Sequence, residues 1–404
     1  MTIDIDSWVR VAAFAGAAFS MGLGAIGAAI GEGFAAGKAN EATSRNPVYS
    51  GEIFKMMLVG QAVAETAAIF ALVIAVLLLF AVGGTISMIT AAGLLGAGLS
   101  MGFGAIGSGI GSGFPAGEAC SGLALQPEMN RSITTTMLIG SAVSQTPAIF
   151  AMVVAFMLMF IDFSASSPHM ISALLAAGMC MGFGAVGSGI GSGYPAGSAC
   201  AGMARQPAMS SRLTTNMLIG AAVSQTPAIF AMVVAFILMF TNFSGLPLHP
   251  TSAAILGAGI ATGMAAIGSG VGSGLVGQTS CEGIARQPLS VTPVTNIMLL
   301  AQAVSQTPAI YGLLISFILI FKKYAPADNI SVSAAFFSAG LCMGLGAIGP
   351  GIGIGYTGSK ATRWVARRPE STGDLTRVML VGQAVSESTA IYSLVISLVL
   401  IFLM

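Results

Sequence analysis

Apolar residues fill ten long runs along the chain, and these runs come in five pairs. In the first pair, residues 11–36 and 53–82, each run exceeds the roughly 20 residues that span a bilayer as a helix. A polar turn separates the two runs of each pair, and a proline in it prevents the first helix from continuing. The turns read Arg45-Asn46-Pro47, Leu125-Gln126-Pro127, Arg205-Gln206-Pro207, Arg286-Gln287-Pro288 and Arg367-Arg368-Pro369. This pattern predicts an all-α membrane protein with ten transmembrane helices in five tandem α-hairpins.

Two sequence blocks recur in phase and define the repeat. Gly-Leu-Gly-Ala-Ile-Gly at residues 22–27 lies in the first run of the unit, and Ala-Val-Ala-Glu-Thr at 62–66 lies in the second. Copies of the second block follow at spacings of 80, 80, 81 and 81 residues. The predicted hairpins are 1–82, 83–163, 164–244, 245–325 and 326–404. Because each crosses the membrane twice, all five have the same orientation and can form a row or a sector of a ring.

Composition and charge support a membrane protein and suggest its orientation. Hydrophobic residues make up 55% of the chain and charged residues only 7%, against about 25% charged residues in soluble domains. The net charge of +1 gives no reason to expect a nucleic-acid partner. Twelve of the 15 Lys and Arg residues lie on the turn side, which predicts cytoplasmic turns with both termini outside. Glu118 and Glu282 lie near this side, and we expect both to be solvated.

A carboxylate stands in the middle of the second run in the first and last hairpins only. At this position the five hairpins read Glu65, Gln145, Gln225, Gln306 and Glu387. An ionised carboxylate in hydrocarbon is costly, so such a residue holds a proton, pairs with a cation or is functional. Glutamine keeps the shape but cannot release a proton. We therefore predict that Glu65 and Glu387 are ion-carrying carboxylates.

Oxygen groups flank the acid position in every hairpin. Two residues earlier stand Val63, Val143, Val223, Val304 and Val385, and one residue later stand Thr66, Thr146, Thr226, Thr307 and Ser388. Backbone carbonyl, hydroxyl and carboxylate oxygens are the ligands that a hard cation accepts. The alternative is that each hydroxyl bonds back to its own helix.

A tyrosine hydroxyl follows the acid position by five residues in the last two hairpins only. The aligned residues are Phe70, Phe150, Phe230, Tyr311 and Tyr392. If each acid meets the tyrosine of the preceding hairpin, Glu387 pairs with Tyr311, and Glu65 pairs with Tyr392 around a closed ring. The alternative is that Phe and Tyr interchange freely on a packing face.

The first helices carry a second variable polar position. The aligned residues are Glu32, Ser112, Ser192, Ser273 and Ile354. Glu32 adds a second acid beside Glu65, and two nearby carboxylates would share a proton, hold a cation, or both. Ile354 adds no polar group near Glu387, so the two sites need not be equivalent.

Three features together resemble the rotor-ring proteolipid, the c subunit, of F-type rotary ATPases, with five hairpins fused in one chain. They are the glycine block of the first helix, the Arg-Gln-Pro turn at 205–207 and 286–288, and the acid of the second helix. The last hairpin, with Gly-Pro-Gly-Ile-Gly at 349–353 and Val-Ser-Glu-Ser at 385–388, is similar to sodium-binding members of the family. In those members the ion site lies between neighbouring hairpins.

Carried over position by position, the resemblance implies two sites. One, a Na⁺ candidate, comprises Glu32, Glu65, Val385, Ser388 and Tyr392, and the other, for Na⁺ or H⁺, comprises Glu387, Val304, Thr307 and Tyr311. Ile354 stands where a sodium ligand is expected, and three adjacent hairpins lack the acid. Fewer carriers mean fewer ions per ATP, which would suit ATP-driven pumping against a steeper gradient.

The resemblance implies a non-catalytic subunit that needs no cofactor besides the transported Na⁺ or H⁺ and couples ion passage to ATP synthesis or hydrolysis on partner subunits. Expected partners are further copies of the chain, possibly other proteolipids, a stator subunit with an essential arginine, the lipid bilayer, and central stalk subunits at the turns bearing Arg45, Arg205, Arg286 and Arg367. The expected location is a prokaryotic plasma membrane. The alternatives are a single-chain secondary transporter or channel built from parallel hairpin repeats, and a structural scaffold.

Overall fold

The computed structural model describes residues 4–80, 86–326 and 329–403, and all regular structure in these ranges is helical. Ten helical segments there are long and apolar enough to cross a membrane, which confirms the predicted fold class. The predicted boundary between residues 82 and 83 lies outside the described ranges. The long helices are α1 (Ile5–Arg45), α2 (Ser50–Phe80), α3 (Met88–Leu125), α4 (Asn130–Phe160), α5 (Met170–Arg205), α6 (Ser210–Phe240), α7 (Leu248–Arg286), α8 (Val291–Ser305), α9 (Thr307–Phe321), α10 (Ile330–Arg367) and α11 (Thr372–Phe402).

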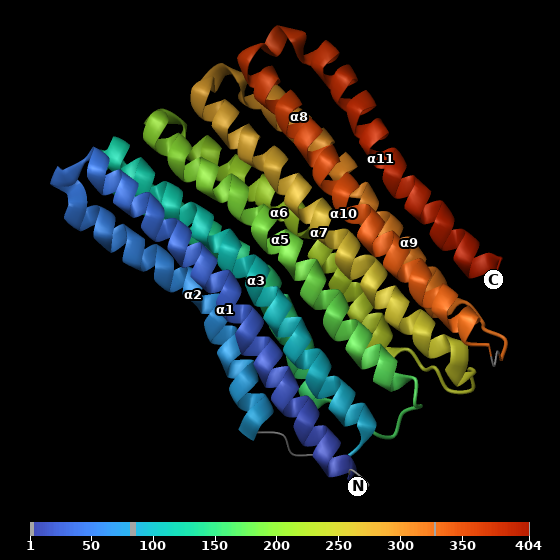
Figure 1. Cartoon of the computed structure of the whole chain (residues 1–404). Helices are drawn as coiled ribbons and strands as arrows, with labels where there is room; N and C mark the ends of the chain where they lie inside the picture. The colour runs from blue at the N-terminus through green and yellow to red at the C-terminus, as the bar shows by residue number, and fades with distance from the viewer. Residues whose placement is uncertain (1–3, 81–85, 327–328, 404) are drawn as a thin grey trace.

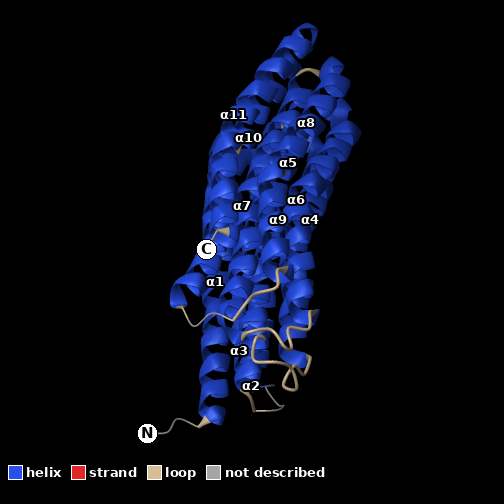
Figure 2. Cartoon of the chain, turned by 90° about the vertical axis from the view of Figure 1, so that its right-hand side faces the viewer, coloured by secondary structure: helices blue, strands red, loops and turns tan. Residues whose placement is uncertain are grey.

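The hairpins stand side by side as a sector with two layers (Figure 1). The first helices α1, α3, α5, α7 and α10 form one layer, and the second helices α2, α4, α6, α8/α9 and α11 form the other. The longer connections between hairpins gather at the end of the bundle opposite the hairpin turns (Figure 2). Both edges of the sector are open, with α1 and α2 at one edge and α10 and α11 at the other.

Each hairpin turn has the same construction. The first helix ends at a residue with an extended backbone, such as Gln206 (φ −140°, ψ 78°), and a proline then starts a short 3₁₀ helix. A residue before proline avoids the helical region for steric reasons, and proline is favoured at the start of a helical turn. These turns are η1 (Pro47–Tyr49), η2 (Pro127–Met129), η3 (Pro207–Met209), η4 (Pro288–Ser290) and η5 (Pro369–Ser371).

The helices are longer than the apolar runs alone predict. Helix α1 has 41 residues, which corresponds to about 62 Å at 1.5 Å per residue, whereas a bilayer with its headgroups is about 40–45 Å thick. Helix α1 is therefore long enough to cross the hydrocarbon core and to extend past the headgroup region.

Glycines bring neighbouring first helices to backbone contact. A Cβ built on Gly191 in α5 would lie 2.0 Å from the Gly270 carbonyl oxygen in α7, and one on Gly111 in α3 would lie 2.0 Å from the Gly189 oxygen in α5. No methyl group fits at either place. The small residue is therefore required by the close helix approach, as is common in membrane bundles.

A polar layer divides the packed interior. One buried hydrophobic cluster fills the half of the bundle near the inter-hairpin connections, and a second fills the half near the turns. Between them lie the glycines of the first helices and the Gln or Glu of the second helices. This layer holds the predicted ion-carrying position.

The second helix of hairpin 4 is broken within this layer. Helix α8 ends at Ser305 and α9 starts at Thr307, with Pro308 near its first residue. Pro147 and Pro227 occupy the aligned positions of α4 and α6, which remain continuous. A proline inside a helix disturbs the hydrogen bonds of the turn around it. Helices α2 and α11, which carry the acids, have no proline.

We predict that Gly191→Ala destabilises the protein because the added methyl group forces α5 and α7 apart. Overpacking of this kind costs about 1–3 kcal/mol. Thermal unfolding in detergent measures the effect, with Gly51→Ala as the control because a Cβ at Gly51 meets nothing within 4 Å. Equal melting temperatures for the two variants would contradict the close approach.

Candidate ion-binding sites between hairpins

The acid position lies at the midpoint of the second helices. Glu387 is the sixteenth of 31 residues in α11, and Glu65 is the sixteenth of 31 in α2. Either end of the helix is therefore about 23 Å away at 1.5 Å per residue. Solvent at the membrane surfaces does not reach this depth, so each carboxyl group depends on neighbouring hairpins for partners.

Glu387 meets a tyrosine from the preceding hairpin. The Tyr311 hydroxyl in α9 donates a hydrogen bond to Glu387 Oε1 in α11 at 2.5 Å. The geometry thus brings together two members of the second predicted set. The other two members bond to each other, with the Thr307 hydroxyl donating to the Val304 carbonyl at 2.7 Å. Ile354, at the aligned first-helix position, is fully buried.

The glutamines of the middle hairpins occupy equivalent places between hairpins. Gln145 Nε2 donates to the Val63 carbonyl at 3.1 Å and to Ser112 Oγ at 2.8 Å. Gln306 Nε2 donates to the Val223 carbonyl at 3.2 Å and to Ser273 Oγ at 2.7 Å. Each amide therefore bridges a valine carbonyl of the preceding hairpin and a first-helix serine of its own.

Gln225 shares the valine contact of this arrangement: its Nε2 donates to the Val143 carbonyl at 2.6 Å. These valine carbonyls and the first-helix residue are the groups that the family resemblance assigns as ion ligands. In the structure an amide N–H group bridges these oxygens. At three consecutive interfaces the amide N–H group is thus bonded to protein oxygens, whereas the amide oxygens of Gln145 and Gln306 are buried with no hydrogen-bond partner among the described residues.

A second row of amides, one turn nearer the hairpin turns, links the hairpins as well. Gln302 Nε2 donates to the Ser273 carbonyl at 2.9 Å and to the Gly220 carbonyl at 3.0 Å. Gln383 Nε2 repeats this at Ile354 (3.2 Å) and Ala301 (3.3 Å). Each amide joins its own first helix to the second helix of the preceding hairpin.

The other predicted site is divided between the two open edges. Glu65 is exposed and Glu32 is partly exposed on the α1–α2 edge, and their carboxylates interact electrostatically. Val385 and Tyr392 are 68% and 65% exposed on α11 at the opposite edge. Ser388, partly exposed there, donates its hydroxyl to the Val385 carbonyl at 2.7 Å. One chain does not bring these five residues together.

Comparison with known proteins identifies the family. The family model for the c subunit of ATP synthase matches five segments, 15–78, 95–158, 175–238, 256–319 and 337–400, one in each hairpin. This chain belongs to the ATP synthase c-subunit family. It is a fused protein of this type, with five hairpins in one polypeptide.

Single-hairpin relatives match one repeat of this fused c subunit. The ATP synthase c subunit of Natranaerobius thermophilus is 54% identical over 79 residues, which cover 20% of this chain and 91% of the relative. That of Petrotoga mobilis is 53% identical over 66 residues, covering 16% and 69%. That of Thermotoga maritima is 47% identical over 75 residues, covering 19% and 88%. The fused chain therefore contains about five such proteins in series.

The sequence did not predict one hydrogen bond that recurs in three hairpins, between a first-helix serine and the backbone of the second helix. Ser108 Oγ accepts the backbone N–H of Ala148 at 3.1 Å, directly after Pro147. The same contact joins Ser188 to Ala228 and Ser269 to Ala309. These serines occur only in the hairpins with the proline, and that co-occurrence was the available signal.

The expectation for Glu118 and Glu282 is wrong. Glu118 pairs with Lys38 at 2.9 Å, and Glu282 pairs with Arg363 at 3.1 Å, each across two neighbouring first helices. The two acid side chains are only 26% and 20% exposed. They connect adjacent hairpins of the fused chain instead of lying free in solvent.

Among the described residues, no three His, Cys, Asp or Glu side chains lie close enough to share a metal ion. An ion at either candidate site would therefore depend on neutral oxygens beside one or two carboxylates.

We predict that Gln306→Glu creates a new titratable group in the interface between hairpins 3 and 4. The carboxylate would face the Val223 carbonyl, an acceptor, so it needs a proton or a cation there. Site-resolved labelling with a carboxyl-reactive carbodiimide should then modify residue 306 in addition to Glu387. Labelling of Glu387 without residue 306 would contradict the equivalence of the two positions.

Proposed function

We propose that this chain is an ion-carrying rotor-ring subunit of a rotary ATP synthase or ATPase, with Glu65 and Glu387 as its carriers. Members of the c-subunit family are membrane subunits, and the ATP chemistry takes place on other subunits. The observation that best supports the proposal is the 2.5 Å hydrogen bond from Tyr311 to Glu387 across two hairpins. A carboxylate held by a neutral donor at mid-membrane can accept and release a small cation.

The second carrier site forms between two copies of the chain in this proposal. The open edges carry matching halves of the interface found inside the chain. A Cβ on Gly355 would lie 2.2 Å from Gly272 in the neighbouring first helix, and the aligned Gly33 has nothing within 4 Å. Gly353, aligned with Gly272, has only Ser386 near it, at 3.7 Å. Gly33 of one copy would face Gly353 of the next.

The amide row supports the same docking. Gln61 Nε2 donates to the Glu32 carbonyl at 3.2 Å, but among the described residues it makes no cross-hairpin bond like those of Gln302 and Gln383. The aligned carbonyl on the opposite edge is that of Gly382, which is partly exposed. Docking would supply this acceptor and place Tyr392 and Val385 beside Glu65. The site of Glu32, Glu65, Val385, Ser388 and Tyr392 would then be complete.

The two sites differ in their chemistry. The site between copies has two carboxylates and suits Na⁺, which accepts carboxylate, carbonyl and hydroxyl oxygens. The internal site has Ile354 in place of Glu32 and suits H⁺, although it could take Na⁺. Two carriers for five hairpins give a low number of ions per ATP, which favours ATP-driven pumping. The turns would face the cytoplasm and contact central stalk subunits, while a stator arginine would release each ion.

The decisive test replaces both carriers in the assembled ATPase. Glu65→Gln with Glu387→Gln should reduce ion-coupled ATP hydrolysis to background because no group remains that can exchange a cation. Asp6→Asn, in the first turn of α1 at the end opposite the hairpin turns, is the control and should keep full coupling. Coupling that survives in the double variant would refute the assignment. Ion transport by the purified chain without ATPase subunits would instead support a single-chain transporter.

A further inference from the structure

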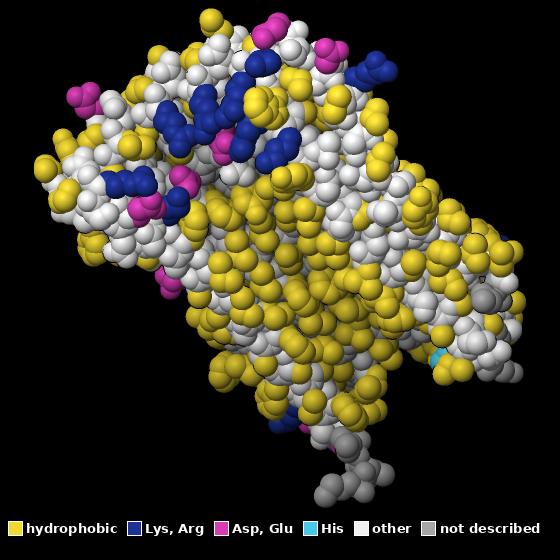
Figure 3. Space-filling view, turned by 45° about the horizontal axis from the view of Figure 1, so that its top comes forward, with side chains coloured by type: hydrophobic (Ala, Val, Ile, Leu, Met, Phe, Trp, Pro, Cys, Tyr) yellow, Lys and Arg dark blue, Asp and Glu magenta, His cyan; other side chains and the backbone are white. Residues whose placement is uncertain are grey.

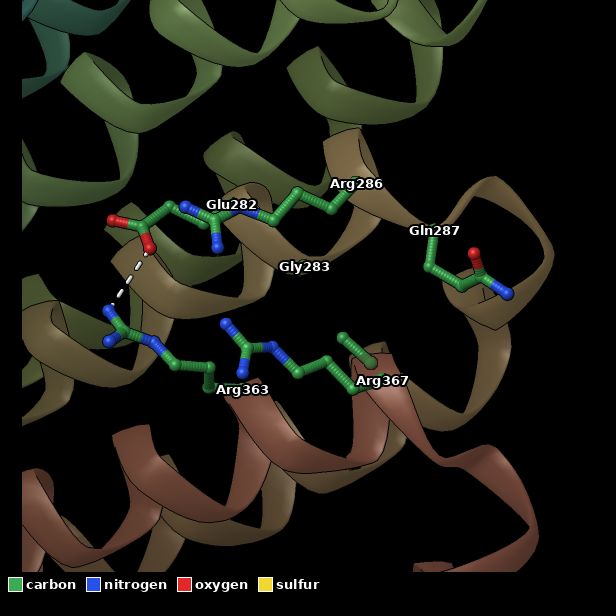
Figure 4. Close-up of a pocket in the computed structure, with 7 residues that line it drawn as sticks. Glu282, Gly283, Arg286, Gln287, Arg363 and Arg367 are labelled. Atoms are coloured by element: carbon green, nitrogen blue, oxygen red, sulfur yellow. Dashed lines mark hydrogen bonds and ion pairs between the residues drawn. The ribbon is translucent and has the colours of Figure 1, made fainter.

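A pocket opens between the turn-side ends of α7 and α10. Its volume is about 330 Å³, and it is lined by Glu282, Arg286 and Gln287 of hairpin 4 and by Arg363, Ala366 and Arg367 of hairpin 5. Figure 4 shows the arginine side chains reaching into the space between the two helices. The pocket is separate from the candidate ion sites, because Arg363 follows Ile354 by nine residues on α10, about 14 Å at 1.5 Å per residue.

The pocket has an excess of positive charge. Glu282 is the one acid in it, and it binds Arg363 Nη2 at 3.1 Å. Within the described part of the chain, Arg363 Nε is buried without a hydrogen-bond partner. Arg367 lies over the Trp364 ring at 4.9 Å. Arg286 forms none of the hydrogen bonds or ion pairs found among the described residues. Two guanidinium groups and one further donor are thus available to an anion.

The neighbouring groove lacks this excess. It occupies about 410 Å³, and its charged lining residues are Lys38, Glu118, Arg205 and Glu282, two of each sign. A single arginine at a helix C-terminus is explained by the helix dipole. The helix dipole does not explain why three arginines from two helices line one pocket. The arrangement is specific to hairpins 4 and 5 within this sector.

The surface of α10 below the pocket changes from charged to aromatic to apolar. Lys360 lies over the ring of Tyr356 at 4.7 Å. Tyr356 is 56% exposed, and Ile352 and Leu345 further along the same face are 37% and 52% exposed. Figure 3 shows the Lys and Arg cluster at the turn end, with a broad hydrophobic band next to it. This order matches a phospholipid with its headgroup at the arginines and its acyl chains on the band.

We propose that Arg286, Arg363 and Arg367 bind the headgroup phosphate of an anionic phospholipid on the first-helix face. Guanidinium groups form paired, charge-assisted hydrogen bonds with phosphate oxygens. Basic pockets between transmembrane helices on the cytoplasmic side suit such headgroups. The apolar band favours a lipid over free phosphate, since free phosphate would use only the arginines. It also favours a lipid over an acidic protein loop, which would gain little from exposed Ile352 and Leu345.

Trp364 provides a local probe for this site. The full chain carrying Trp8→Phe keeps Trp364 as its one tryptophan. It would be reconstituted in vesicles of phosphatidylcholine with either brominated phosphatidylglycerol or brominated phosphatidylcholine. The ratio of the two quenching efficiencies reports which lipid is next to Trp364. We expect a preference for phosphatidylglycerol, which Arg286→Gln reduces about fivefold, as expected for one arginine at a membrane surface.

Arg212→Gln is the matched control because Arg212 is an exposed turn-side arginine on α6, outside the pocket. It should leave the preference unchanged. The proposal fails if Arg286→Gln has no more effect than Arg212→Gln. It also fails if excess inorganic phosphate abolishes the preference, which would indicate a free-phosphate site. Loss of stalk binding by Arg286→Gln with unchanged lipid preference would indicate a protein-docking surface instead.

Discussion

Polar groups at the centre of this bundle must be satisfied by the protein because hydrocarbon offers no hydrogen bonds. The chain meets this requirement in two ways, except at the side-chain oxygens of Gln145, Gln302, Gln306 and Gln383, which are buried with no partner among the described residues. In the middle hairpins, amide N–H groups such as that of Gln145 bridge neighbouring hairpins. At the last interface, Glu387 relies on the Tyr311 hydroxyl. Glu65 has the same requirement, and the partners that we propose for it, Val385 and Tyr392, lie on the opposite edge of the sector.

The distribution of the proposed carriers, Glu65 and Glu387, follows from this division. In a ring of such chains, Glu387 of one copy and Glu65 of the next occupy adjacent interfaces, followed by three interfaces held by glutamine. Ion exchange would then occur in closely spaced pairs during rotation, and torque would be uneven. In the proposed ring, glutamine would take the place of the carboxylate at these three interfaces, because its side chain has nearly the same shape.

The sequence predicted the fold well because helix length and turn chemistry are local properties. Apolar runs above 20 residues and a proline in every turn define five hairpins with little ambiguity. The contact between Glu387 and Tyr311 was also foreseeable, because a tyrosine occurs in the hairpin that precedes each acid, counted around a closed ring. The exact ligand contacts were not: the Thr307 hydroxyl at the start of α9 bonds to the Val304 carbonyl near the end of α8 instead of reaching Glu387.

Features at the turn-side ends were harder to foresee. The pairs Lys38–Glu118 and Glu282–Arg363, and the arginine pocket, depend on how each helix is rotated about its axis and how far it extends past the bilayer. Neither property is encoded in apolar run length. The sequence shows that Gln145, Gln225 and Gln306 are neutral residues at the position of the acid. It does not show that they bridge two hairpins, because this depends on the distance between the hairpins.

The most direct test of the two-carrier arrangement is carbodiimide labelling of Glu65 and Glu387, resolved by site, in the assembled ring and in the dissociated single chain, with and without Na⁺. We expect Na⁺ to protect Glu65 in the assembled ring only, because its site needs Tyr392 and Val385 of the preceding copy. The reactivity of Glu387 should be the same in both states, because its partner Tyr311 lies in the same chain. Protection of Glu65 in the isolated chain, or assembly-dependent labelling of Glu387 alone, would contradict this arrangement.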